Sequence, residues 1–78
     1  MMHQFNIVMH SFQQVQRFVD LAMNQPFDVM VGNDYQNING KDIMGMFSLD
    51  YRFPLKVSVT CSQKEFEAFQ NDVLSLSA

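Results

Sequence analysis

The sequence is short of cysteine and of basic residues, and these two scarcities exclude several classes of protein. Its 78 residues include one cysteine, Cys61, which rules out an internal disulfide framework and indicates a reducing compartment. Five Lys and Arg are scattered against eight Asp and Glu, giving a net charge of -3 and no basic footprint for nucleic acid. No apolar run approaches the roughly 18 residues of a membrane span, and no signal peptide is recognisable. We therefore expect a cytoplasmic protein that binds neither nucleic acid directly nor a membrane.

The sequence contains enough hydrophobic residues to form one core. Hydrophobic residues make up 47% of the chain, including eight Phe and seven Met, whereas charged residues make up only 17%. A chain of this length forms one small domain, predicted here as residues 1–78, and must bury most of its large apolar side chains to be stable. The low charge predicts a surface rich in Gln, Asn and Ser, with some apolar groups exposed.

Hydrophobic periodicity predicts the order of secondary structure. Residues 3–9 alternate as a strand does, and Ser11 is suited to cap a helix that ends near Asn24, before Pro26. That helix has an apolar stripe at helical spacing, made of Phe12, Val15, Phe18, Val19 and Ala22. The remaining predicted elements are strands at 27–31, 35–38 and 55–60, a short helix at 43–48, and a final helix that opens with the capping box 62–65. The order β-α-β-β-α-β-α predicts an α+β fold, a four-stranded antiparallel sheet with helices on one face. The pattern does not predict the order of strands in the sheet.

One segment carries a sharper signal. Residues 41–49 read Lys-Asp-Ile-Met-Gly-Met-Phe-Ser-Leu. This segment resembles the regulatory-site segment of HPr, the histidine phosphocarrier of the bacterial sugar phosphotransferase system. In that family it reads Lys-Ser-Ile-Met-Gly, and its serine is phosphorylated by a kinase. The resemblance covers nearly the whole chain and implies the HPr-like open-faced β-sandwich, with Asp42 at the place of the regulatory serine.

A second family signature, the His-x-Arg-Pro stretch that carries the phosphohistidine, is absent. Residues 11–14 at that place read Ser-Phe-Gln-Gln, and about three residues of the preceding loop are missing. Phosphoryl transfer needs a nucleophilic imidazole and donors for the phosphate oxygens, whereas Ser11 is an unactivated hydroxyl and Gln13 is neutral. The resemblance therefore implies a degenerate phosphorylation position at Ser11. We predict no catalytic residue, no enzymatic activity and no cofactor.

His10 is the alternative phosphorylation position, because it lies one residue before the aligned place. No Arg or Pro follows it at the family's spacing, and strand alternation sends it to the face opposite Phe5 and Ile7. We therefore interpret His10, and likewise His3, as solvent-facing. Two His and one Cys offer no recognised spacing for a metal site.

Asp42 has two interpretations. Phosphorylation of the aligned serine adds about -1.5 to -2 of charge at the start of a helix, and an aspartate supplies -1 permanently. The first hypothesis is a permanent partial mimic of the phosphorylated state. The second is a helix cap stabilised by the helix dipole.

The resemblance implies that Ile43, Met44 and Phe47 form a partner-binding patch. A short helix must bury one side, so Ile43 or Met46 is expected inside, with Met44 and Phe47 exposed. The alternative is that all four side chains fill a small core.

These residues lead to three hypotheses about function. The first is a non-catalytic regulatory or adaptor domain related to the phosphotransferase system, similar to the Crh-type members of the family, which act by protein binding. Its partner would be a transcriptional repressor, a metabolic enzyme, a phosphotransferase component or a second copy in a homodimer. The second is a working phosphocarrier that uses His10. The third is an interaction module with no link to the phosphotransferase system.

Overall fold

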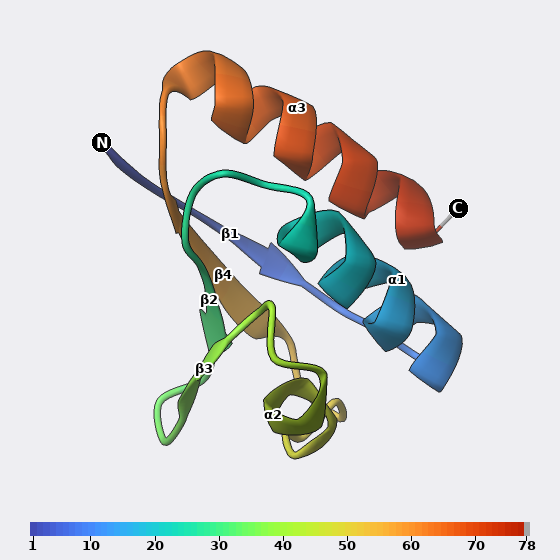
Figure 1. The fold of residues 1–78 in the computed structure, drawn as a ribbon. Helices are drawn as coiled ribbons and strands as arrows, with labels where there is room; N and C mark the ends of the chain where they lie inside the picture. The colour runs from blue at the N-terminus through green and yellow to red at the C-terminus, as the bar shows by residue number, and fades with distance from the viewer. Residues whose placement is uncertain (78) are drawn as a thin grey trace.

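The computed structural model describes residues 1–77, which form one sheet covered by helices (Figure 1). In chain order the elements are β1 (Met2–Ile7), α1 (Phe12–Met23), β2 (Val29–Gly32), β3 (Asn37–Asn39), α2 (Ile43–Phe47), β4 (Leu55–Thr60), α3 (Gln63–Leu74) and a short 3-10 turn (Ser75–Ser77). The predicted order β-α-β-β-α-β-α is confirmed, and the 3-10 turn is an addition to it. No helix within residues 1–77 is long and apolar enough to cross a membrane.

The sheet is antiparallel throughout and has the strand order β1-β4-β2-β3. The last strand of the chain is therefore inserted between the first two. The register places Val57 of β4 between Phe5 of β1 and Val31 of β2. Strand alternation then turns these three side chains to the same face, where they are buried.

The core lies between that face of the sheet and the helices, as the α+β prediction requires. All three helices lie together on this side in Figure 1. The side chains that fill the layer between the central strands and the first and third helices are Phe5, Ile7, Val15, Phe18, Val19, Ala22, Val29, Val31, Leu55, Val57, Val59, Phe69 and Val73. The opposite face carries exposed side chains such as Gln4, Asn6 and Lys56 and is covered by no helix.

The predicted capping signals define where the two long helices begin. Ser11 has an extended backbone and accepts the Gln14 N–H on Oγ at 3.2 Å. Ser62 accepts the Glu65 N–H at 3.2 Å, and Glu65 in turn accepts the Ser62 N–H at 3.1 Å. Each bond satisfies an amide that the first helical turn leaves without a partner.

β1 ends earlier, and β3 begins later, than the alternation of the sequence predicts. β1 ends at Ile7 because its partner strand begins at Leu55, directly opposite, so Met9 has no partner in the ladder. β3 begins at Asn37 because the preceding residues form the turn, in which the Asn33 N–H donates to the Gln36 carbonyl at 2.9 Å.

Two side-chain predictions are wrong. Phe12 was expected in the buried stripe of α1 but is 73% exposed, because it is the first residue of the helix and its ring contacts Phe47 of α2 rather than the core. His3 was expected in solvent but is half-buried and stacked on Phe66, with ring centroids 4.5 Å apart. It has the same strand parity as Phe5, and this parity turns it toward the helices.

Candidate protein-docking surface

Ser11, predicted from the resemblance to be a degenerate phosphorylation position, lies at the N-terminus of α1. Its side-chain oxygen is already the N-cap acceptor, and no basic residue lies in the first turn beside it. Gln13, which the resemblance aligns with the family's arginine, is exposed and carries no charge. No described side chain that could act as a base is hydrogen-bonded to its hydroxyl, so nothing in this geometry activates Ser11 as a nucleophile.

Gln14 ties this region to the end of the chain. Its Oε1 accepts the backbone N–H of His10 at 2.7 Å, and its Nε2 donates to the Leu76 carbonyl at 3.2 Å. This one side chain therefore holds the residue before the helix and the turn after α3 in place. The His10 side chain itself is exposed, as the strand alternation predicts.

Asp42 occupies the N-cap position of α2, but its side chain does not make the capping hydrogen bond. Its backbone carbonyl accepts the Met46 N–H at 2.9 Å, so the helix starts without help from the carboxylate. A Cβ on Gly45 would lie 2.9 Å from Asp42 Oδ2 and 2.7 Å from Ile38 Cγ2, so glycine alone leaves this room. The expectation that Asp42 caps the helix through its side chain is therefore wrong, because the exposed carboxylate lies over Gly45 instead.

Helix α2 presents part of its apolar surface to solvent. Met46 is fully buried and Ile43 is half-buried against the core, whereas Met44 is 76% and Phe47 43% exposed. The phenyl rings of Phe47 and Phe12 meet edge to face, with centroids 5.5 Å apart and an interplanar angle of 84°. Two exposed rings from different helices thus form one cluster.

A shallow groove of about 390 Å³ continues this cluster along α1. Its walls come from the segment between β1 and α1, the start of α1 and the loop before β4. They are formed by Met9, His10, Ser11, Phe12, Val15, Tyr51 and Arg52. We call Phe12, Met44 and Phe47, together with this groove, the docking surface.

Tyr51 and Arg52 order the loop at the edge of the docking surface. The Tyr51 hydroxyl donates to the Met46 carbonyl near the end of α2, and burial raises the pKa of Tyr51 to about 12. Arg52 donates to both carboxylate oxygens of Asp50, with Nε–Oδ1 at 3.0 Å and Nη2–Oδ2 at 2.9 Å. These hydrogen bonds from Arg52 lower the pKa of Asp50 to about 2.

The Asp50–Arg52 pair predicts a specific acid sensitivity. A lowered pKa in the folded state contributes stability that is present above the ordinary aspartate pKa, about 3.9, and is lost as the pH falls toward 2. We expect the urea midpoint of the wild type to fall more between pH 4.5 and 2 than that of Asp50→Asn. The effect should be small because both side chains face solvent. Circular dichroism at several pH values measures it, with Asp20→Asn on α1 as control; equal falls in all three proteins would contradict the prediction.

Sequence reasoning missed two residues of this surface. Phe12 was assigned to the core because it continues the helical stripe, and Arg52 gave no signal because 40 positions separate it from Phe12 in the chain. Only the path of the loop before β4 brings Arg52 into the groove that His10 and Ser11 also line. Within residues 1–77, no group of three or more His, Cys, Asp and Glu side chains is placed to hold a metal ion.

Comparisons with known proteins identify the fold. No protein-family model matches the chain, and no curated protein does. Among solved structures, it is similar to the phosphocarrier protein HPr of Bacillus anthracis, with 21% identity and a TM-score of 0.70 over 91% of this chain and 95% of that one. It is similar also to HPr-C-His from Thermoanaerobacter tengcongensis, with 21% identity and a TM-score of 0.69 over 95% of this chain and 89% of that one. The chain therefore has the HPr-like fold.

Proposed function

We propose that the chain is a non-catalytic regulatory or adaptor domain that acts by binding a protein, and that it derives from a phosphocarrier whose phosphorylation position has degenerated. The observation that carries this proposal is the exposed pair of rings, Phe12 and Phe47, beside Met44. Aromatic residues and Met are enriched at protein interfaces, where rigid rings supply contact area and flexible Met adapts to the partner. A chain with so small a core gains nothing in stability from exposing three such side chains.

The surroundings of Ser11 support the loss of carrier function. Its hydroxyl is occupied as the cap of α1, and Gln13 cannot offer the guanidinium fork that binds phosphate oxygens. Gln14 is engaged on both sides by backbone groups. The phosphorylation position has therefore become part of the helix start, and the protein is not an enzyme in this proposal.

The partner in this proposal recognises an apolar patch next to a fixed negative charge. Asp42 lies at the start of the helix that carries Met44 and Phe47, and its carboxylate is exposed rather than used as a cap. This supports the hypothesis of a permanent partial mimic of a phosphorylated serine. A transcriptional repressor, a metabolic enzyme or a phosphotransferase component that reads such a charge is the expected class of partner.

One observation favours the second candidate, a working phosphocarrier that uses His10. Arg52 lines the same groove as His10 at the N-terminus of α1 and would supply the donor that the sequence lacks at the family's spacing. Asp50 accepts hydrogen bonds from Nε and Nη2 of that side chain, however, and offsets its positive charge. The adaptor is therefore the better supported function.

Phosphoryl transfer separates the two candidates. The purified protein is incubated with phosphoenolpyruvate and the general phosphotransferase enzyme, and any adduct is read by intact mass and by its acid lability. We expect no added phosphate under conditions that label a true HPr completely. An acid-labile phosphate that disappears in His10→Ala would show a carrier and contradict the proposal.

Protein binding is tested at the docking surface itself. A photo-crosslinking amino acid is placed at Met44, and a matched one at Gln4 on the bare face of the sheet. We expect a discrete crosslinked partner from position 44 alone. Equal capture from both positions would contradict a specific surface, and a partner without any phosphotransferase link would favour the third hypothesis.

A further inference from the structure

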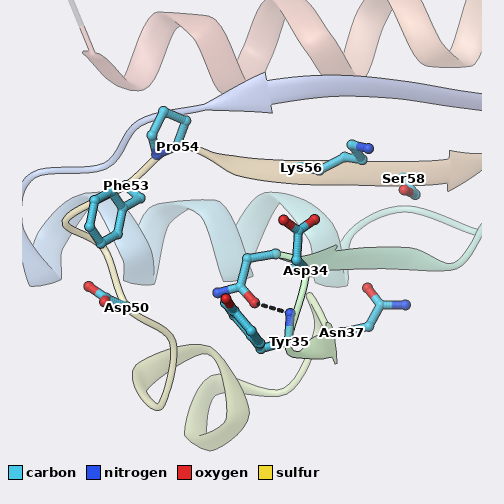
Figure 2. Close-up of a pocket in the computed structure, with 10 residues that line it drawn as sticks. Asp34, Tyr35, Asn37, Asp50, Phe53, Pro54, Lys56 and Ser58 are labelled. Carbon is cyan, nitrogen blue, oxygen red and sulfur yellow. Dashed lines mark hydrogen bonds between the residues drawn. The ribbon is translucent and has the colours of Figure 1, made fainter.

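A second groove lies on the bare face of the sheet, away from the docking surface. Its volume is about 420 Å³, within the range of small-molecule sites. Figure 2 shows it between the loop that carries Phe53 and the turn that carries Tyr35, with β4 running along one side. The residues that line it are Gly32, Asn33, Asp34, Tyr35, Asn37, Asp50, Phe53, Pro54, Lys56 and Ser58.

The turn on one rim is held by its own hydrogen bonds. Asn33 Oδ1 accepts the N–H groups of Tyr35 at 2.8 Å and Gln36 at 3.0 Å, and the first of these bonds is drawn in Figure 2. A Cβ on Gly32 would lie 2.1 Å from the Gln36 carbonyl oxygen, so the turn folds tightly over this glycine. The backbone that presents the Tyr35 ring is therefore ordered, although the ring itself is 94% exposed.

The loop on the other rim is held by the Asp50–Arg52 pair. The same guanidinium lies 5.7 Å from the centroid of the Phe53 ring, over one of its faces. The Phe53 ring is 62% exposed and retains a second face for a ligand. Two exposed aromatic rings thus border the groove on backbone segments that are already ordered, which lowers the entropic cost of binding.

Polar side chains between the rims have no partners within the described chain. Asp34, Asn37, Lys56 and Ser58 make no side-chain hydrogen bond or ion pair in residues 1–77. Together they offer a carboxylate, a carboxamide, an ammonium and a hydroxyl, which include both donors and acceptors. In Figure 2 the Asp34 carboxylate points toward β4, the strand that carries Lys56 and Ser58.

We propose that this groove binds a neutral saccharide ring. A sugar hydroxyl donates and accepts at once, so neighbouring hydroxyls satisfy the Asp34 carboxylate and the Lys56 ammonium together. The apolar C–H face of the ring packs against Tyr35 or the free face of Phe53, which are rigid, amphipathic or apolar surfaces of matching size. Charge argues against other small ligands, because Lys56 opposes a cation and Asp34 opposes an anion, whereas Arg52 already offsets the charge of Asp50.

This site is independent of the proposed adaptor function. The docking surface is built from α1, α2, the segment before α1 and residues 51–52. The groove is built from the turn between β2 and β3, the loop before β4 and the outer face of β4. The two regions meet only in the loop around Asp50 and Arg52. Saccharide binding can therefore fail while protein binding holds, and the reverse.

Amide NMR of the full chain titrated with glucose and with maltose tests the proposal. We expect shifts confined to residues 32–37 and 53–58, with a dissociation constant on the order of millimolar, as for a small ligand in an open site. Tyr35→Ala and Lys56→Met should each weaken binding about tenfold. Met23→Ala, which removes an exposed side chain outside both the groove and the docking surface, should leave binding unchanged.

Three results would overturn the proposal. The first is the absence of saturable shifts up to roughly a hundred times the expected constant. The second is shifts of the same size in Met23→Ala, Tyr35→Ala and Lys56→Met, which would show unspecific contact. The third is a larger chemical-shift change of the same amides with choline or with inorganic phosphate than with the sugars. Choline is a cation that binds aromatic rings, and a preference for either probe would show that the groove binds a charged ligand.

Discussion

A Phe69→Ala variant is expected to lose about 3–5 kcal/mol of unfolding free energy, the largest effect of any change considered. Phe69 is 1% exposed, and its ring contacts three others edge to face. Its centroid lies 6.3 Å from that of Phe5, 6.0 Å from Phe18 and 5.8 Å from Phe27. The side chain thus joins the last helix to the first strand, to α1 and to the segment before β2, and its removal leaves a cavity at their common centre.

The total unfolding free energy of a 78-residue domain is only about 4–12 kcal/mol. This variant should therefore be largely or partly unfolded at 37 °C. Urea denaturation followed by circular dichroism measures the loss, and the thermal midpoint should fall by more than roughly 12 °C. Phe53→Ala is the matched control, because it removes the same ring from an exposed loop and should cost less than about 1 kcal/mol. Equal losses in both variants would show that the aromatic cluster is not the centre of the core.

The second large effect concerns binding rather than folding. Phe12→Ala and Phe47→Ala should each weaken binding of the partner captured at the docking surface by roughly 30-fold or more, the scale of an interface hot spot. Both rings are exposed, so each variant should remain folded. The two rings also stabilise each other through their edge-to-face contact, and either single variant removes this contact. The double variant should therefore lose less binding free energy than the sum of the two single losses.

Isothermal titration of the partner with each variant measures this loss. Met23→Ala offers a matched control, because Met23 is 61% exposed at the opposite end of α1. The prediction would be contradicted if Phe12→Ala and Phe47→Ala kept full affinity while Met23→Ala lost affinity. That result would place the interface at the other end of α1. A circular dichroism spectrum of each variant separates lost binding from lost structure.

Much of the fold was predictable from local pattern. Alternation around Phe5 and Ile7 and again around Val57 predicts strands, because side chains of a strand point to opposite faces in turn. The capping box at Ser62 predicts the start of α3, because its hydrogen bonds involve only residues three apart. Such interactions involve only residues that are close in the sequence, so they can be predicted without the rest of the chain.

The candidate site was less predictable. Met44 and Phe47 lie on the surface as the short helical pattern suggests, but their role in binding stays a prediction. Asp42 lies where a cap is expected and yet makes no capping bond, because its carboxylate lies over Gly45. Sequence spacing places a residue on an element; it does not choose the rotamer of an exposed side chain.

The elements, their order and the α+β class follow from the amino-acid sequence, because periodicity, capping and turn chemistry act over a few residues. The strand order, the exposure of Phe12, the partial burial of His3 and the place of Arg52 in the groove that His10 lines became known from the folded chain. Each of these depends on contacts between residues far apart in the chain. The energies of these contacts depend on how the sheet and helices pack, and a local sequence pattern does not predict that packing.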